Sequence, residues 1–260
     1  MSSYQKGDPL WNALLYVISP VITLSVVSFY IGLLLSLILI IAVVALVFVL
    51  FVKFRLLGKK KNCSNHDLSI GFFHPYCDAG GGGERVLWCA IRAIQKRFPA
   101  AKIYVYTGDV DAAPDQIIAR AKQRFNLDLS SANQLEFVYL HRRKWVEAEM
   151  YPFFTLLGQS LGSIYLGLEA IDKCCPKVFI DTMGYAFTLP LFKYIGDCKV
   201  GSYVHYPTIS TDMLDKVRSR TMGFNNRRGI ASSKVATHFK LVYYKVFLIK
   251  ITVDICLKYF

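Results

Sequence analysis

The sequence predicts an α/β protein in which an amino-terminal transmembrane helix precedes a Rossmann-like parallel-sheet domain. Two observations predict this class. No Asp, Glu, Lys, Arg or His occurs from Pro9 to Val52, and short apolar stretches alternate with helical patterns after Leu68. Four consecutive glycines, Gly80 to Gly83, lie at one strand-to-helix junction. Apolar residues make up 54% of the 260 and charged residues 19%, which excludes a disordered chain, a collagen-like repeat and a coiled coil.

The charge-free segment is expected to be a retained membrane anchor. A bilayer core is spanned by roughly 20 apolar residues, and this segment is longer. A signal peptide has an apolar region of about 7 to 15 residues and then a small-residue cleavage site, whereas this segment runs into Lys53. Ser19-Pro20 could divide a helical hairpin, but the first arm would be short, so we favour a single pass. Residues 1–61 are therefore interpreted as anchor and basic linker.

The charges that flank the anchor predict its orientation. Lys6 and Asp8 precede it, and five basic residues follow within ten positions: Lys53, Arg55, Lys59, Lys60 and Lys61. The positive-inside rule then places residues 62–260 in the cytosol. Seven cysteines, an odd number without a C-x-x-C pair, are expected to be reduced there, with Cys174-Cys175 in packing roles. The glycosylation sequon Asn62-Cys63-Ser64 should then carry no glycan.

Strand and helix patterns alternate along the rest of the chain. Apolar runs predict strands at Leu68–Phe73, Lys102–Tyr106, Leu135–Leu140, Lys177–Asp181 and Lys199–His205. Helical spacing predicts helices at Glu84–Phe98, Pro114–Phe125, Pro152–Ile171 and Leu189–Tyr194, although Gly158, Gly162 and Gly167 weaken the third. This alternation indicates a parallel sheet covered on both faces.

In such a sheet ligands bind at the carboxyl ends of the strands, and the glycine segment follows the first strand. Gly80, Gly81, Gly82 and Gly83, followed by Glu84 and Arg85, can bring backbone N–H groups of a helix N-terminus close to a phosphate or sugar. The segment is neither a P-loop nor G-x-G-x-x-G. The alternative interpretation of the segment is a flexible turn.

Two further strand ends carry candidate residues. His205 is expected to end the fifth strand, where it could hydrogen-bond a sugar or phosphate or transfer a proton, or could be purely structural. Asp181 ends the fourth strand and either binds a hydroxyl or caps the following turn.

Basic residues suggest a membrane-surface partner. Arg142, Arg143 and Lys144 follow the third strand and either contact anions or lipid headgroups or are simply solvated. From His205 onward ten basic residues oppose three acidic ones, a net +7 of the total +13. An anionic membrane or a pyrophosphate-linked lipid fits this charge better than nucleic acid, for which no recognition motif is present.

Two long segments carry a family resemblance. His74 to Trp88 (HPYCDAGGGGERVLW) and Tyr203 to Met213 (YVHYPTISTDM) closely resemble the eukaryotic α-1,2-mannosyltransferases of asparagine-linked glycosylation, which extend a dolichol-pyrophosphate-linked oligosaccharide. The resemblance extends from the anchor to about Phe247.

The resemblance implies a retaining GT-B glycosyltransferase at the cytosolic face of the endoplasmic reticulum membrane. It would take mannose from GDP-mannose, with no cofactor and no metal, and partners would include the dolichol-linked oligosaccharide and other mannosyltransferases of the pathway. His205 would correspond to the catalytic histidine near the transferred sugar. Gly80 to Arg85, Asp181 and Tyr206 would contact the donor pyrophosphate or the acceptor, because a leaving diphosphate needs oriented N–H donors.

The chain departs from this family in one respect. Its acidic residues never form the Glu-x7-Glu spacing of the second, donor-binding domain, and the residues after Phe247 diverge. Residues 62–260 are therefore interpreted as the acceptor-side domain of a GT-B fold whose donor domain is absent, and the chain alone is expected to be inactive. The alternative function is a non-enzymatic, membrane-anchored module that binds lipid pyrophosphate or a partner glycosyltransferase.

Overall fold

The computed structural model describes residues 9–57, 63, 66–129, 134–205, 209–223, 226 and 228–246. Tyr206 and the tail after Phe247, both singled out above, lie outside the described residues. The chain forms two compact units, Met1–Val52 and Lys53–Phe260.

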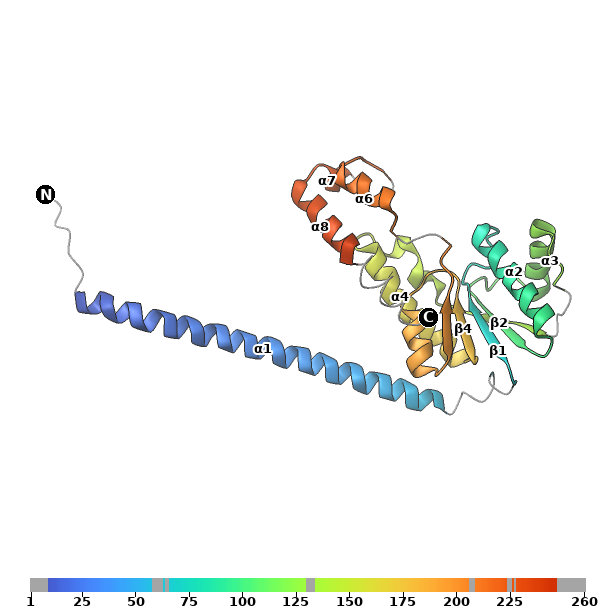
Figure 1. Cartoon of the computed structure of the whole chain (residues 1–260), viewed down its shortest axis with the longest axis horizontal. Coiled ribbons are helices and arrows are strands. Elements are labelled where there is room, and N and C mark those ends of the chain that lie inside the picture. Colours follow the sequence, from blue (N-terminus) through green and yellow to red (C-terminus); the bar gives the residue numbers. More distant parts are fainter. Residues whose placement is uncertain are drawn as a thin grey trace. The chain divides into compact units, whose positions relative to one another are not determined.

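The amino-terminal helix α1 runs without interruption from Pro9 to Leu57 (Figure 1). It continues through Pro20, so the helical hairpin is not formed. By length and composition, Ser19–Arg55 could cross a membrane. The hydroxyls of Thr23, Ser25 and Ser36 donate to carbonyls one turn earlier in the same helix, so these donors need no partner from a hydrocarbon surrounding.

The second unit contains a five-stranded parallel sheet in the order β3-β2-β1-β4-β5. The strands are β1 (Ser69–Phe73), β2 (Lys102–Thr107), β3 (Leu135–Tyr139), β4 (Val178–Asp181) and β5 (Lys199–Ser202). The three central strands are more buried than the edges, as expected where helices cover both faces of a sheet. The predicted α/β class is confirmed.

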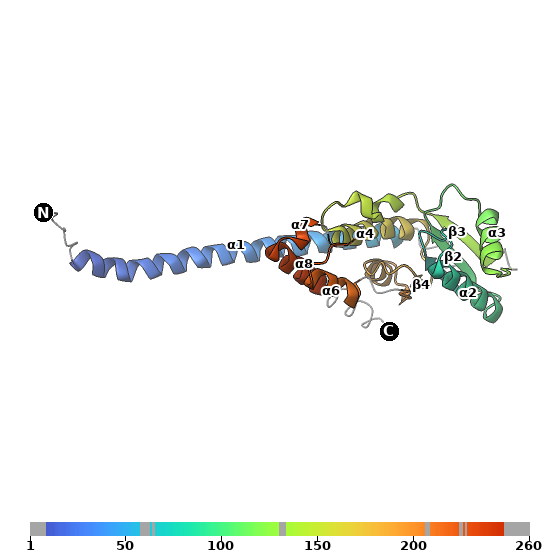
Figure 2. The same cartoon turned by 90° about the horizontal axis from the view of Figure 1, so that it is seen from above.

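Helices α2 (Gly82–Arg97) and α3 (Pro114–Phe125) lie on one face of the sheet, and α4 (Thr155–Lys173) lies on the other (Figures 1 and 2). Side chains alternate along each strand. Phe72 therefore joins the core under α2 with Leu87, Trp88 and Ile91. The opposite face holds four aromatic rings, with Phe179 and Phe192 stacked 3.5 Å apart between centroids and Phe73 and Tyr106 packed around them. Phe192 comes from the π-helical turn η4 (Leu191–Ile195), which follows α5 (Thr188–Pro190).

Most predicted elements are confirmed to within a few residues, but the fifth strand is shorter than expected. It ends at Ser202, three residues before His205. Its last ladder bond is donated by the N–H of Tyr203 to the carbonyl of Asp181 at 2.7 Å. Because β4 ends at Asp181, there is no further strand to pair with, and His205 lies in the loop beyond the sheet.

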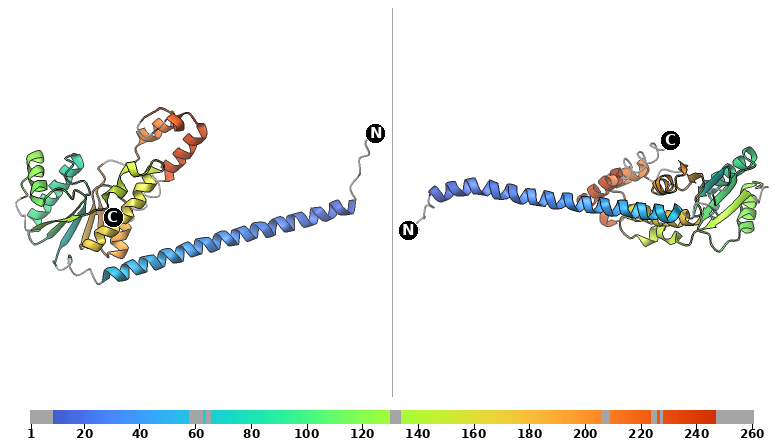
Figure 3. Two further views of the ribbon diagram at one scale, coloured as in Figure 1. Left: turned by 180° about the vertical axis from the view of Figure 1, so that it is seen from behind. Right: turned by 90° about the horizontal axis from the view of Figure 1, so that it is seen from below.

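Several helices were not predicted. The short 3-10 turns η2 (Arg143–Val146) and η3 (Ala148–Met150) precede α4, and α6 (Thr211–Arg218), α7 (Arg228–Ala231) and α8 (Lys234–Val246) follow the sheet. The last three gather beside the amino-terminal end of α4 (Figures 1 and 3). Their cluster is centred on Ile209, Val217 and Tyr244. The tie to α4 is a hydrogen bond of 2.9 Å from the N–H of Leu157 to the hydroxyl of Tyr243.

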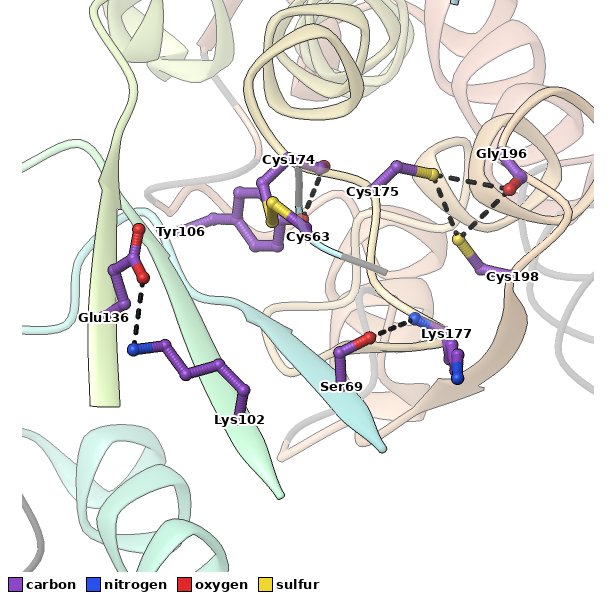
Figure 4. The surroundings of a disulfide bond; sticks show 10 residues. All are labelled: Cys63, Ser69, Lys102, Tyr106, Glu136, Cys174, Cys175, Lys177, Gly196 and Cys198. Atoms are coloured by element: carbon purple, nitrogen blue, oxygen red, sulfur yellow. Dashed lines mark hydrogen bonds and ion pairs between the residues drawn. A yellow bond between two sulfur atoms is a disulfide. The ribbon is translucent and has the colours of Figure 1, made fainter. Parts of the chain in front are cut away.

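The expectation that every cysteine is reduced is wrong for one pair, because the structure joins Cys63 and Cys174 in a disulfide (Figure 4). The two residues are 111 positions apart, and spacing along the chain therefore gave no signal. Cys175 does take the packing role expected of it. Its sulfur lies 3.5 Å from that of Cys198, and both are buried behind η4.

Candidate functional site

The order of the strands locates a candidate site. Chain connections run outward in one direction from β1 to β2 and β3, and in the other direction to β4 and β5, so the order reverses between β1 and β4. Ligands of open α/β sheets bind at such a reversal, outside the carboxyl ends of the strands. Phe73 and Asp181 pair there as the last residues of β1 and β4. The glycine segment, Asp181–Tyr185 and His205 all follow strands at this edge, as predicted.

The glycine segment forms the turn between β1 and α2. Gly80 has a φ of +81°, which side-chain-bearing residues rarely adopt, and the guanidinium of Arg124 occupies the space where its Cβ would be. Gly81 is the N-cap residue of α2, and its N–H donates to the Glu84 carboxylate. The turn is therefore fixed by specific contacts, which weakens its alternative reading as a flexible turn.

Glu84 is buried, and it bonds within the protein. Besides Gly81, its carboxylate contacts Nε2 of His74 at 3.3 Å, and this bond is the main reason why its pKa lies below the usual range. Arg85, in contrast, is exposed on the first turn of α2. Of these two neighbours, Arg85 is the one whose side chain can reach a ligand, and Glu84 holds the loop.

His74 is a residue that the sequence reasoning missed, although it stands in the quoted motif. It is completely buried directly after β1, and its Nδ1 lies 2.8 Å from the hydroxyl of Thr182. If Thr182 donates to Nδ1, the neutral imidazole carries its proton on Nε2 and donates it to Glu84. A chain of hydrogen bonds then runs from the end of β4 through His74 to the glycine turn. A buried polar residue at a strand end was the signal that could have found it.

His205 and the glycine segment meet in the structure, 123 positions apart in sequence. The closest side-chain atom to an ideal Cβ on Gly82 would be Nε2 of His205, at 2.9 Å. Only a residue without a side chain allows this approach. His205 is exposed, and its Nδ1 lies 3.1 Å from the hydroxyl of Tyr203. With that hydroxyl donating, the imidazole carries its proton on Nε2, beside the N-terminus of α2.

Asp181 lies beneath this surface. Its side chain is fully buried, Oδ1 accepts the N–H of Met183 at 3.1 Å, and Oδ2 has no hydrogen-bond partner among the described residues. Burial raises its pKa from 3.8 to about 7, against the smaller lowering effect of the backbone N–H groups of Met183, Gly184 and Tyr185. The geometry corresponds to the capping role, because no atom of the carboxyl reaches a ligand from outside.

This carboxyl should make stability depend on pH. The folded state keeps the Asp181 proton up to about pH 7, whereas the unfolded state loses it near pH 3.8. The contribution of the protonated carboxyl to the free energy of unfolding is therefore complete below pH 3.8 and is lost as pH rises to 7. Asp181→Asn retains the Oδ1 acceptor and places an amide where the protonated oxygen stood. We expect the stability of the variant relative to the wild type to increase by about 3 kcal/mol from pH 5 to pH 8. Thermal unfolding of both chains at these two pH values measures it, and parallel curves would contradict the burial argument.

The basic run after β3 divides into different roles. Arg143 pairs with Asp109, lies 3.7 Å from Glu147 and stacks over the ring of Tyr76 at 4.9 Å, so its charge is used inside the protein. Arg142 and Lys144 are exposed. No group of three or more His, Cys, Asp or Glu residues that could hold a metal ion occurs in the part of the chain that the structure describes.

Comparison with known proteins identifies relatives of this chain. Residues 67–256 match the family described as "ALG11 mannosyltransferase N-terminus". The chain is 57% identical over 195 residues to a human protein named "GDP-Man:Man(3)GlcNAc(2)-PP-Dol alpha-1,2-mannosyltransferase", covering 75% of this chain and 39% of that protein. Proteins of the same name from Xenopus tropicalis (56%; 74% of this chain, 38% of that protein) and Dictyostelium discoideum (55%; 73% and 37%) are similar. The chain thus spans about two fifths of these curated relatives, and no solved structure matches it.

Proposed function

The chain belongs to the ALG11 mannosyltransferase N-terminus family, and we propose that it forms the membrane-anchored, acceptor-side part of a mannosyltransferase. This enzyme would transfer α-1,2-linked mannose from GDP-mannose to a Man3GlcNAc2 oligosaccharide on dolichol pyrophosphate, as the names of the relatives state for those proteins. The observation that carries the proposal is the contact between Gly82 and His205. Both residues lie within the matched range, and they meet at the sheet edge where ligands of this fold class bind.

The site residues would act on the developing charge of the leaving diphosphate. N–H groups at the N-terminus of α2 are oriented before substrate arrives, because Glu84, His74 and Thr182 fix the turn. His205, with Nε2 beside Gly82, would donate a hydrogen bond to the transferred mannose or the diphosphate. We propose that no metal is required for this step. The exposed side chain of Arg85, three residues after Gly82, would supply positive charge to the diphosphate. Asp181 would act by holding the loop after β4 through its bond with Met183. Tyr206, next to His205 in sequence, would contact the donor pyrophosphate or the acceptor.

We propose a division of labour between two domains, as in GT-B transferases. Residues 62–260 would bind the lipid-linked acceptor, and a second Rossmann-like domain would bind most of GDP-mannose. The two-fifths coverage of the relatives is consistent with this division. Other mannosyltransferases of the pathway are proposed partners.

The decisive experiment separates acceptor binding from transfer. The full chain in nanodiscs should bind a Man3GlcNAc2-pyrophosphate lipid saturably. Paired with the donor domain of a relative, it should convert the acceptor to the α-1,2-mannosylated product when GDP-mannose is present. Acceptor binding without transfer in that pairing would favour the non-enzymatic module instead. Absence of acceptor binding would overturn the proposal.

We propose that α1 anchors the chain in the endoplasmic reticulum with the second unit facing the cytosol. The sequon at Asn62 tests this orientation, because glycosylation occurs only on the lumenal side. A shift on endoglycosidase treatment would place the domain in the lumen. In the cytosol Cys63 and Cys174 would be held as adjacent thiols, since that compartment is reducing. Alkylation of both residues in intact cells, followed by mass spectrometry, provides the second readout.

A further inference from the structure

One surface of the second unit is apolar and largely exposed, and of its rings Phe154 alone reaches α8, where it packs against Tyr243 at 5.6 Å between centroids among the described residues. It is formed by the exposed face of α4 and the turns that precede it, and we call it the α4 face: Trp145, Met150, Phe153, Phe154, Leu157 and Leu161. Phe153 is 78% exposed, Phe154 68% and Leu161 55%. Leu157 and Leu161 lie one turn apart on the helix, and the edge of Trp145 packs against Tyr165 one turn further on, at 5.6 Å between centroids. Large apolar side chains are thus exposed along α4 and the turns that precede it.

Helix α4 is apolar on both sides. Its inner side packs on the sheet unit through buried residues that include Leu166 and Ala170. No Asp, Glu, Lys, Arg or His occurs from Met150 to Leu168, so the outer side has no charge until the last turn, where Asp172 and Lys173 are exposed. A helix that covers a soluble domain normally presents polar residues to water on its outer face. A helix that is apolar on all sides is normally covered on all sides. We therefore expect the outer face of α4 to be covered as well.

The charges at the edge of the α4 face are predominantly positive. Arg142 and Lys144 are exposed beside Trp145, and the guanidinium of Arg142 lies 4.2 Å above the ring of Tyr165. They outnumber Glu149, the exposed acid next to Met150. Trp and Tyr with adjacent Arg and Lys are typical of the boundary between the hydrocarbon and the headgroups of a bilayer.

Chain connectivity keeps this surface near a membrane. Helix α1 ends at Leu57, and the Cα atoms of Cys63 and Cys174, the C-cap residue of α4, lie 5.6 Å apart, so the two residues are neighbours as a disulfide or as two thiols. Six peptide units separate Leu57 from Cys63 and can span at most about 22 Å. If α1 crosses a bilayer, the carboxyl end of α4 therefore cannot lie far from the headgroups, and the domain is presented to the membrane surface at a high effective concentration.

We propose that the α4 face is a membrane-docking surface whose partner is an anionic phospholipid bilayer. Its aromatic and aliphatic side chains enter the headgroup and upper acyl region, and Arg142 and Lys144 contact lipid phosphates. This second attachment would orient the domain on the membrane that carries the lipid-linked acceptor. It depends on α1 being in a bilayer and not on mannosyl transfer, so it stands or fails separately from the proposed function.

The test uses the full chain in nanodiscs of phosphatidylcholine and phosphatidylserine. A nitroxide is attached through p-acetylphenylalanine at Phe153 or, in a second variant, at Leu161. The matched control is Phe98, an exposed phenylalanine (44%) at the end of α2, and Leu39 in α1 reports insertion of the anchor. Relaxation of each nitroxide by oxygen, which concentrates in lipid, is compared with relaxation by a water-soluble nickel chelate.

We expect the ratio of oxygen to nickel accessibility at positions 153 and 161 to be several-fold higher than at position 98. Arg142→Gln with Lys144→Gln, or nanodiscs without phosphatidylserine, should reduce it. Nickel accessibility at 153 equal to that at 98, with position 39 inserted, would overturn the proposal. Shielding from both reagents would also overturn it, because another protein segment or a second copy would then cover the face. Far-UV circular dichroism of each labelled chain confirms that it is folded.

Discussion

Gly162→Ala is expected to lower the free energy of unfolding by about 3 to 4 kcal/mol. Gly162 is buried in α4, where the helix passes over η2, and an ideal Cβ would lie 1.7 Å from the carbonyl oxygen of Trp145. That oxygen also accepts the hydroxyl of Tyr151 at 2.8 Å. Because the obstacle is backbone, α4 and η2 must separate to admit a methyl group. Urea unfolding of the full chain in detergent, followed by near-UV circular dichroism, measures the loss.

Gly167→Ala in the same helix is the matched control. Its Cβ would meet a methyl group of Leu191 at 2.9 Å, a side-chain atom that can rotate away. Both substitutions gain the helix propensity of alanine, about 1 kcal/mol, so the control should stay within about 1 kcal/mol of the wild type. Equal losses at the two positions would contradict the backbone-contact explanation.

His205→Ala is expected to reduce the rate of mannosyl transfer by about 10² to 10⁴-fold, the usual contribution of a positioned hydrogen-bonding or proton-transferring side chain. The rate is measured in a two-domain enzyme with this chain as its amino-terminal part and the donor domain of a relative. His205→Gln retains a hydrogen-bond donor but cannot transfer a proton at neutral pH. Recovery of most of the rate by glutamine would therefore assign a hydrogen-bonding role, and a rate unchanged by alanine would remove His205 from the mechanism.

A pair of glycine substitutions tests whether the contact with the glycine segment matters. Gly82→Ala places a methyl group 2.9 Å from Nε2 of His205 and should displace the imidazole, with a loss of roughly tenfold or more in rate. Gly83→Ala, one residue further along α2, meets only Cε1 of His74 at an ordinary 3.8 Å and should lower the rate clearly less than Gly82→Ala. Equal effects of the two variants would show that the approach of His205 to Gly82 is not used.

The sequence predicted the architecture well because its signals are local. A charge-free run of this length needs no tertiary context, and α3, predicted as Pro114–Phe125, begins and ends at those residues because proline starts it and Asn126 at φ +52° ends it. The prediction that the fifth strand ends at His205 was wrong, because β5 ends where its partner β4 ends. The length of a strand thus depends on pairing with another segment, which the local pattern does not show.

Three features of the fold and the site could not be predicted for the same reason. Gly162 and Gly167 weakened the expectation of a helix, yet they are the positions at which α4 closely approaches its neighbours. His74 gave no signal of its own, since its partners Thr182 and Glu84 come from different elements. The Cys63–Cys174 disulfide joins residues that no spacing rule connects.

By itself the sequence determined the long apolar helix that could cross a membrane, the alternation of strands and helices, and the family to which the chain belongs, because hydropathy, periodicity and long motifs are properties of contiguous residues. Only the tertiary structure decided which residues meet. It placed Nε2 of His205 beside Gly82, buried Asp181 with no partner for Oδ2 among the described residues, and left Phe153 and Leu161 of the α4 face exposed. Such contacts depend on the order in which the parallel strands assemble, and that order reverses at β1 and β4.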